Sequence, residues 1–266
     1  MNEISAPLVA AATVLLVRKA DPQLQVFMVV RHHQIDFASG ALVFPGGKLE
    51  KADGDERLIP YIGGIDVAKD ELRAFRVAAI REAFEECGVL LARAKGEKSL
   101  VSAARLKQLE DKWREKLAKD EANILDMVTA EDLELAADLM LPYSHWLTPQ
   151  FVKRRFDTWF FIAEAPADHV AVHDGHESVD SVWISPSEAL ADLAAGKRTI
   201  IYPTRLNLML LDQSRTVAQA LDASRTRKVA PVQPWVEDVN GQKMLKIDPN
   251  WGFPMIDAPI DPRMRG

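Results

Sequence analysis

The sequence predicts a fold that combines helices with a β-sheet, either mixed α+β or a layered α/β/α arrangement. Two apolar, β-branched runs near the N-terminus, residues 8–17 and 24–30, are typical of paired strands. Strand-like composition returns at 155–163 and 179–184, after a long charged segment, 93–141, whose apolar residues recur at helical spacing. This order of strands, helix, helical insertion, strands and helix favours a mixed α+β or a layered α/β/α fold.

The bulk composition is that of a globular protein. Of the 266 residues 48% are apolar and 27% charged, and the net charge of −6 argues against a nucleic acid or an anionic membrane as the main partner. The apolar N-terminal run is too short to span a bilayer and is closed by Arg18 and Lys19. The single cysteine, Cys87, rules out an intramolecular disulfide and fits a reducing, cytoplasmic compartment.

The N-terminal elements follow from turn signals. Asp21 and Pro22 separate the first two strands, which predicts a β-hairpin. Residues 41–49 are expected to contain a third, short strand, cut off by Pro45 and two glycines. Residues 51–65, rich in Asp, Gly and Pro, are expected to form a loop.

A helix is expected from Asp66 to about Leu91. Asp66 is a suitable N-cap, and Gly88 is placed to end the helix. One apolar stripe along it predicts a buried face; its members are Val77, Ile80, Phe84 and Cys87.

The segment 93–141 is expected to contain two helices. An apolar stripe marks the first and consists of Leu106, Leu109, Trp113 and Leu117. Thr129 with Asp132 resembles the start of the second, which would continue through Leu133, Ala136, Leu139 and Met140. Two interpretations remain open, a lid that selects substrate and a helical pair packed on the core.

Three elements are predicted near the C-terminus. Ser185 or Ser187 caps a short helix at 185–190, and one long helix is expected from Thr204 to about Ser224. Asn240 with Gly241 predicts a hairpin within 235–247.

Three glutamates, Glu82, Glu85 and Glu86, lie on one side of the predicted helix, nearly opposite its apolar stripe. Arg81 stands four residues before Glu85, where an ion pair can orient that carboxylate. A solvated acidic face is the simplest explanation. However, Glu82 and Glu86 repel each other at this spacing, and converging carboxylates are what Mg²⁺ or Mn²⁺ require. The pattern therefore favours a carboxylate metal site.

The stretch REAFEECGV, residues 81–89, resembles the core of the Nudix box, R-E-U-x-E-E-x-G-U with U apolar, at every fixed position. Gly47 and Asp53 resemble the opening G-x5-E of the box, with Asp in place of Glu. Here 27 residues separate Asp53 from Arg81, where the family usually has seven. Such an interruption is similar to that of a subgroup that includes the mammalian peroxisomal CoA diphosphatases.

The resemblance implies a Nudix fold, an α/β/α sandwich with a mixed sheet, as a single domain over 1–266. It would carry a box insertion at 54–73, the helical insertion at about 93–141, and a C-terminal helix and tail at about 203–266.

The resemblance also implies site roles, as follows. Glu82, Glu85 and Glu86 would bind the metal. Glu82 would also orient or deprotonate water, and Arg81 would hold Glu85 in place. Gly46 and Gly47 would place backbone near the phosphates. A carboxylate from a later loop often serves as base, and Glu177 is the candidate here.

The expected substrate is a small nucleotide diphosphate. Arg31, Gly40 and the Phe44–Gly47 segment keep the frame of a signature shared by CoA-hydrolysing Nudix proteins, although His32 and Asp36 depart from it. CoA or acyl-CoA would be cleaved to 3′,5′-ADP and (acyl-)phosphopantetheine. The alternatives are a diphosphatase for NADH, ADP-ribose or a nucleotide sugar, and a non-catalytic nucleotide-binding protein of Nudix fold. The resemblance also allows a homodimer. Further basic candidates for substrate contact are His32, Lys48, Lys153, Arg154 and Arg155.

Overall fold

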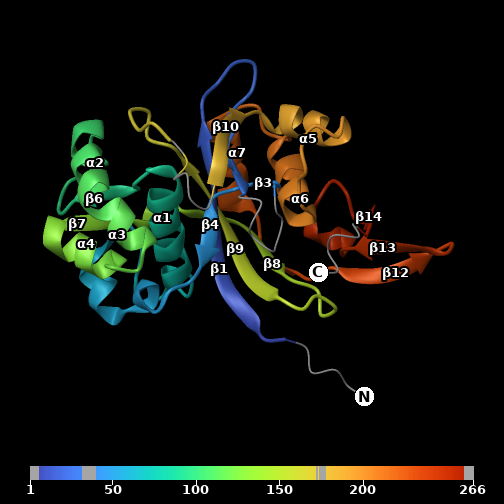
Figure 1. Ribbon diagram of the computed structural model, residues 1–266, viewed down its shortest axis with the longest axis horizontal. Helices are drawn as coiled ribbons and strands as arrows, with labels where there is room; N and C mark the ends of the chain where they lie inside the picture. Colours follow the sequence, from blue (N-terminus) through green and yellow to red (C-terminus); the bar gives the residue numbers. More distant parts are fainter. Residues whose placement is uncertain (1–5, 32–39, 172, 174–177, 261–266) are drawn as a thin grey trace.

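The computed structural model describes residues 6–31, 40–171, 173 and 178–260, and a mixed β-sheet lies at its centre (Figure 1). The strand order is β10-β2-β1-β9-β8-β11, with β3 paired to β2 and β4 paired to β1. The central strand β1 runs antiparallel to β2 and β4 but parallel to β9. The strands of this sheet are β1 (Leu8–Arg18), β2 (Gln25–Arg31), β3 (Leu42–Val43), β4 (Gly46–Lys48), β8 (Leu141–Leu147), β9 (Arg155–Glu164), β10 (Ser178–Ile184) and β11 (Pro231–Val232).

The sheet divides the hydrophobic interior into two cores. Successive side chains of a strand point to opposite faces, and β1 follows this rule. Ala12, Val14 and Leu16 enter the core beneath α1 (Arg73–Cys87), whereas Leu15 and Val17 enter the core beneath the C-terminal helices. Figure 1 shows α1 and the insertion on one side of the sheet and α5 and α6 on the other, which is the layered arrangement that the Nudix resemblance implies.

Helix α1 buries the predicted stripe completely and ends at Gly88, whose φ of 67° is left-handed, as expected. The predicted start at Asp66 is wrong, because α1 begins at Arg73. The Asp70 carboxylate accepts a hydrogen bond from the Leu72 backbone N–H at 3.0 Å. This local bond competes with a helical turn there.

The segment expected as a loop, 51–65, has regular structure. It forms two short 3-10 helices, Lys51–Gly54 and Glu56–Tyr61, followed by strand β5 (Ile62–Gly63). The first of them lies against α1 and becomes important at the site described below.

The first helix predicted in the insertion is present, and all side chains of its Leu106–Leu117 stripe are buried. That helix runs through α2 (Ala103–Leu109), a π-helical turn (Glu110–Arg114) and α3 (Glu115–Ala118). The predicted helix starting at Thr129 is wrong: α4 (Ile124–Glu131) ends there, and Asp132 has a left-handed φ of 50°.

The residues after Asp132 form a strand instead. Strand β7 (Leu133–Ala136) pairs with β5 and with β6 (Ala92–Ala94) in a second small sheet, and a 3-10 turn (Ala137–Leu139) follows. Alternating burial of Leu133 and Leu135 in the core favours this extended form.

On the other face, α5 (Pro186–Ala194) begins as predicted, with the Ser185 hydroxyl accepting from the Glu188 backbone N–H. The single helix expected at 204–224 is wrong, because the chain forms α6 (Tyr202–Leu211) and α7 (Val217–Thr226). Thr216 and Gln219 form a reciprocal capping box that starts α7 anew.

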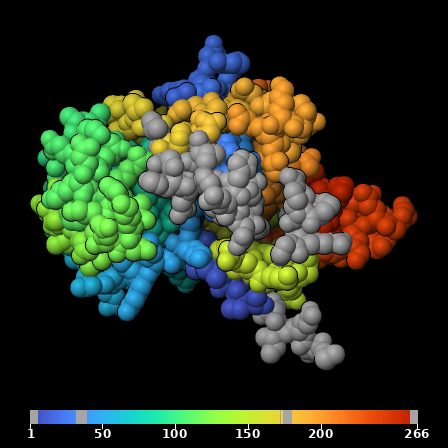
Figure 2. All heavy atoms as spheres, in the orientation of Figure 1, coloured from blue at the N-terminus to red at the C-terminus, as the bar shows by residue number. Residues whose placement is uncertain are grey.

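The C-terminal segment adds a third sheet of β12 (Trp235–Val239), β13 (Gln242–Lys246) and β14 (Asp257–Pro259). Its hairpin turns at Asn240 and Gly241, as predicted, with φ values of 55° and 83°. The insertion and this hairpin form opposite flanks of the molecule (Figure 2). No helix in the described ranges combines the length and apolar character needed to cross a membrane.

Candidate active site

A cavity of about 860 Å³ opens beside the C-terminal half of α1 and the edge formed by β4. It brings together the residues predicted for the site, with one exception. Those lining it are Arg31, Gly46, Gly47, Arg81, Glu82, Glu85 and Glu86. The exception is Glu177, which lies outside the described residues, so its predicted role stays a prediction.

Arg81 is the hub of the polar network in this cavity. Its guanidinium is almost fully buried, and Nη1 lies 3.0 Å from carboxylate oxygens of Glu50 and Glu82 and 3.2 Å from one of Glu85. The expected Arg81–Glu85 ion pair is thus present. Although burial opposes the charge, the carboxylates around it, Glu82 first, hold the pKa of Arg81 above its ordinary value. Arg81 is therefore permanently cationic.

Asp53 also forms an ion pair with Arg81. It is fully buried, and its two oxygens accept from Arg81 Nε at 3.0 Å and from Nη2 at 3.1 Å. The backbone N–H of Glu50, the N-cap of the 3-10 helix Lys51–Gly54, donates to Asp53 at 2.8 Å. Despite the long insertion, Asp53 and Arg81 therefore meet as a two-pronged ion pair.

The three glutamates carry more negative charge than Arg81 neutralises. Glu82 and Glu86 are each 8% exposed, which excludes a solvated acidic face. Burial raises the pKa of Glu85 to about 7, although Arg81 acts in the opposite direction. Glu50 was missed by the sequence reasoning, and burial raises its pKa as well. A cluster of this kind is suited to an added cation.

Two glycines bring backbone close to these carboxylates. The Gly46 N–H donates to Glu86 Oε2 at 2.9 Å. A Cβ at Gly47 would lie 2.4 Å from Glu82 Oε1, and one at Gly46 would lie 2.4 Å from the Ala12 carbonyl. A side chain is therefore excluded at Gly46, where the clash is with backbone, whereas one at Gly47 would displace the Glu82 carboxylate.

The donor set fits a hard divalent cation in chemistry, since carboxylate oxygens dominate it. Across the described ranges, however, no three His, Cys, Asp or Glu side chains are already arranged around one point as ligands. Like charges repel, so the carboxylates turn instead to Arg81 and to the Gly46 N–H.

The insertion reaches the site in two ways that the sequence did not indicate. Arg114 donates to the backbone carbonyls of Glu85 at 2.9 Å and Glu86 at 3.0 Å, and so fixes the last turn of α1. Leu117 and Asp120 line the cavity beside Glu50. Both interpretations of the insertion thus have a physical basis, because it packs on the core and borders the cavity.

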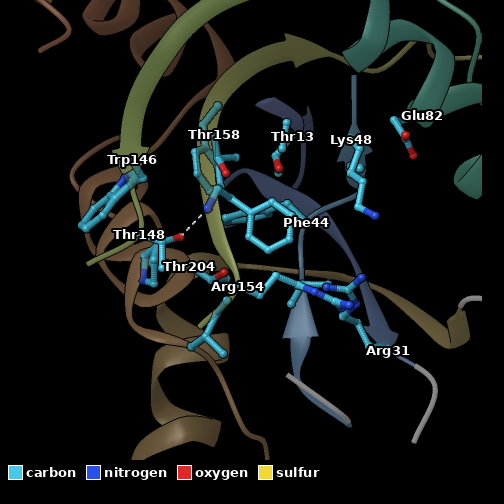
Figure 3. A pocket seen from close by; sticks show the side chains of 18 of the residues that line it. Thr13, Arg31, Phe44, Lys48, Glu82, Trp146, Thr148, Arg154, Thr158 and Thr204 are labelled. Atoms are coloured by element: carbon cyan, nitrogen blue, oxygen red, sulfur yellow. Dashed lines mark hydrogen bonds between the residues drawn. The ribbon is translucent and has the colours of Figure 1, made fainter. Parts of the chain in front are cut away.

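The part of the cavity away from α1 is basic and aromatic (Figure 3). Of the basic candidates, Arg31, Lys48 and Arg154 line it, whereas Lys153 does not. Arg155 is buried and donates to the carbonyls of Ala6 and Thr148, which is a structural role. His32 lies outside the described residues. The aromatic wall consists of Phe44, Trp146, Phe151, Phe156, Phe160 and Tyr202.

Comparison with known proteins gives a consistent result. The family model described as NUDT19 Nudix domain matches residues 65–209. Acyl-coenzyme A diphosphatase NUDT19 of Xenopus laevis is 29% identical over 213 residues, which cover 65% of this chain and 56% of that protein. The human protein of the same name is 35% identical over 123 residues, covering 44% and 33%. The chain thus spans about half the length of the curated relatives it matches.

Among solved structures, a NUDIX hydrolase from Alicyclobacillus acidocaldarius superposes with a TM-score of 0.67 at 23% sequence identity. The match covers 85% of this chain and 99% of that structure. At this identity the likeness shows the fold, and it agrees with the mixed sheet and flanking helices described above.

Proposed function

Because this chain belongs to the Nudix hydrolase family, we propose that it hydrolyses the diphosphate linkage of CoA or acyl-CoA. The products would be 3′,5′-ADP and (acyl-)phosphopantetheine. The observation that carries the proposal is the meeting of Glu82, Glu85 and Glu86 with the Gly46–Gly47 backbone in one large cavity. The relatives' description as acyl-coenzyme A diphosphatases supports CoA as the substrate class.

Several residues of the chain would have separate roles in this reaction. Gly46 and Gly47 let the phosphates approach backbone that a side chain would block. Arg81, fixed by Asp53, holds Glu82 and Glu85 at the cavity wall. Glu82 then orients the attacking water and accepts its proton as the P–O–P bond breaks.

A divalent ion, Mg²⁺ or Mn²⁺, would be held by Glu82, Glu85 and Glu86, and would neutralise phosphoryl oxygens and make bound water more acidic. Burial raises the pKa of Glu85, and a bound cation would favour its charged form.

Glu86→Gln tests the proposal directly. The amide oxygen of glutamine still accepts from the Gly46 N–H, so the fold is retained, whereas the charge needed for a divalent ion is lost. We expect Mg²⁺-dependent release of 3′,5′-ADP to fall at least about a hundredfold, with an unchanged melting temperature. Glu188→Gln, on the exposed side of α5, is the matched control and retains full activity.

Wild-type activity in Glu86→Gln would contradict the metal assignment. A panel of CoA, acyl-CoA, NADH, ADP-ribose and a nucleotide sugar decides the substrate class. If the wild-type protein binds one of these ligands tightly but cleaves none of them, the chain is a nucleotide-binding protein and not an enzyme.

A further inference from the structure

Three cations project into the cavity from three different elements. Arg31 comes from the end of β2, Lys48 from the end of β4, and Arg154 from the β8–β9 connection. Figure 3 shows the side chains of Arg31 and Arg154 extending toward one another, with Lys48 in this view between them and Glu82. We call Arg31, Lys48 and Arg154 the cationic cluster.

Among the described residues, no carboxylate forms an ion pair with any member of the cationic cluster. This contrasts with other surface arginines of the same chain, such as Arg93, which pairs with Asp138, and Arg105, which pairs with Glu131. Two guanidinium groups that approach each other repel, so their convergence costs free energy unless an anion lies between them.

The charge in the cavity is divided between its two sides. The glutamates on α1 would bind divalent cations, which suit the scissile diphosphate beside Gly46 and Gly47. The two arginines lie on the other side of Lys48 from Glu82 in Figure 3. Because the divalent cations would neutralise the diphosphate, the positive charges of these two arginines are not needed for it. A phosphate monoester, with a charge of roughly −1.5 to −2 at neutral pH, matches them.

We propose that the cationic cluster binds a second phosphate of the substrate, one that is not cleaved, and that Arg154 is a specificity-determining residue for it. This inference rests on the proposed diphosphatase function. The ligand would be a nucleoside diphosphate compound whose ribose carries an additional phosphate monoester, as the 3′-phosphate of CoA does. Guanidinium groups suit it because they donate paired hydrogen bonds to phosphate oxygens.

Arg154→Gln tests this assignment, with CoA and 3′-dephospho-CoA as the paired substrates. We expect the ratio of kcat/KM for CoA to that for 3′-dephospho-CoA to fall about tenfold in Arg154→Gln, because only CoA carries the additional phosphate. Lys153→Gln removes the same charge from the neighbouring exposed position, which does not line the cavity, and leaves both values unchanged. Arg154 is exposed, so the variant is expected to fold.

A binding measurement separates this inference from the proposed function. In calorimetry, the preference of wild-type protein for adenosine 3′,5′-bisphosphate over AMP should fall about tenfold in Arg154→Gln, whether or not any substrate is turned over. Equal losses for the paired ligands would assign Arg154 to the scissile diphosphate, and no loss would make it a solvated surface charge. Either result overturns the inference. Absence of turnover by the wild-type protein contradicts the proposed function alone.

Discussion

We expect replacement of Asp53 by alanine to lower the free energy of unfolding by about 3 kcal/mol. Asp53 is fully buried and accepts from Arg81 at two positions, 3.0 and 3.1 Å away. Breaking a buried pair by removing one partner typically costs 3–5 kcal/mol, because the other charge is left uncompensated. The lower end of that range applies here, since Glu50, Glu82 and Glu85 remain around Arg81.

Urea denaturation of wild type, Asp53→Ala and Asp53→Asn measures this cost. Asparagine retains one acceptor for Arg81, so its loss should be about half as large. Asp222→Ala is the control, because it breaks an exposed pair with Arg225 and should cost less than about 1 kcal/mol. A loss for Asp53→Ala no larger than that of the control would refute the claim that this pair anchors α1 to the segment before it.

Three further results are expected. Arg114→Gln should lower kcat at least about threefold while costing about 1–2 kcal/mol of stability, because the final carbonyls of α1 lose their donors; unchanged kinetics would contradict this role. Gly47→Ala should lower kcat/KM at least about tenfold with a melting temperature within a few degrees of wild type, since a Cβ there displaces the Glu82 carboxylate; a fully active variant would show that Glu82 moves without consequence. Glu131 has a pKa of about 2, because hydrogen bonds from Lys112, Trp113 and Arg105 outweigh the effect of burial, which raises it. A carboxyl group whose pKa is lower in the folded than in the unfolded protein stabilises the fold at pH values above its unfolded pKa of about 4.3. That contribution is lost as the pH falls toward 2. In urea titrations, Glu131→Gln should therefore be about 2 kcal/mol less stable than wild type at pH 7, a figure reduced for the solvent screening of the partly exposed Arg105 and Lys112. Most of this difference should be lost at about pH 2.5, and a gap that does not depend on pH would contradict the assignment.

The site helix could be predicted because its signals are local. Helical spacing separates the apolar stripe of α1 from its glutamates, and Gly88 ends the helix with a left-handed φ. Spacing also placed Arg81 within reach of Glu85. The full burial of this network could not be predicted from the sequence, because it depends on the 3-10 helix Lys51–Gly54 and on the insertion. Both are distant from the glutamates of α1 in sequence.

The errors arose where a short pattern fits two structures. Thr129 to Met140 has helical spacing in sequence, yet the chain turns at Asp132 and pairs β7 with two distant strands. The break between α6 and α7 depends on the capping box of Thr216 with Gln219, within a segment of uniformly helical composition. Arg114 gave no local signal, since its partners are backbone carbonyls of another element.

The placement of Cys87 in the buried stripe of α1 makes the natural chain suitable for site-specific labelling. Its thiol is shielded from solvent, and the sequence contains no other cysteine. A cysteine introduced at Lys153, on the exposed β8–β9 connection next to the cavity, would therefore be the one readily accessible thiol. A fluorophore or spin label attached there would report how the rim of the cavity responds to nucleotide without removal of a native residue from the core.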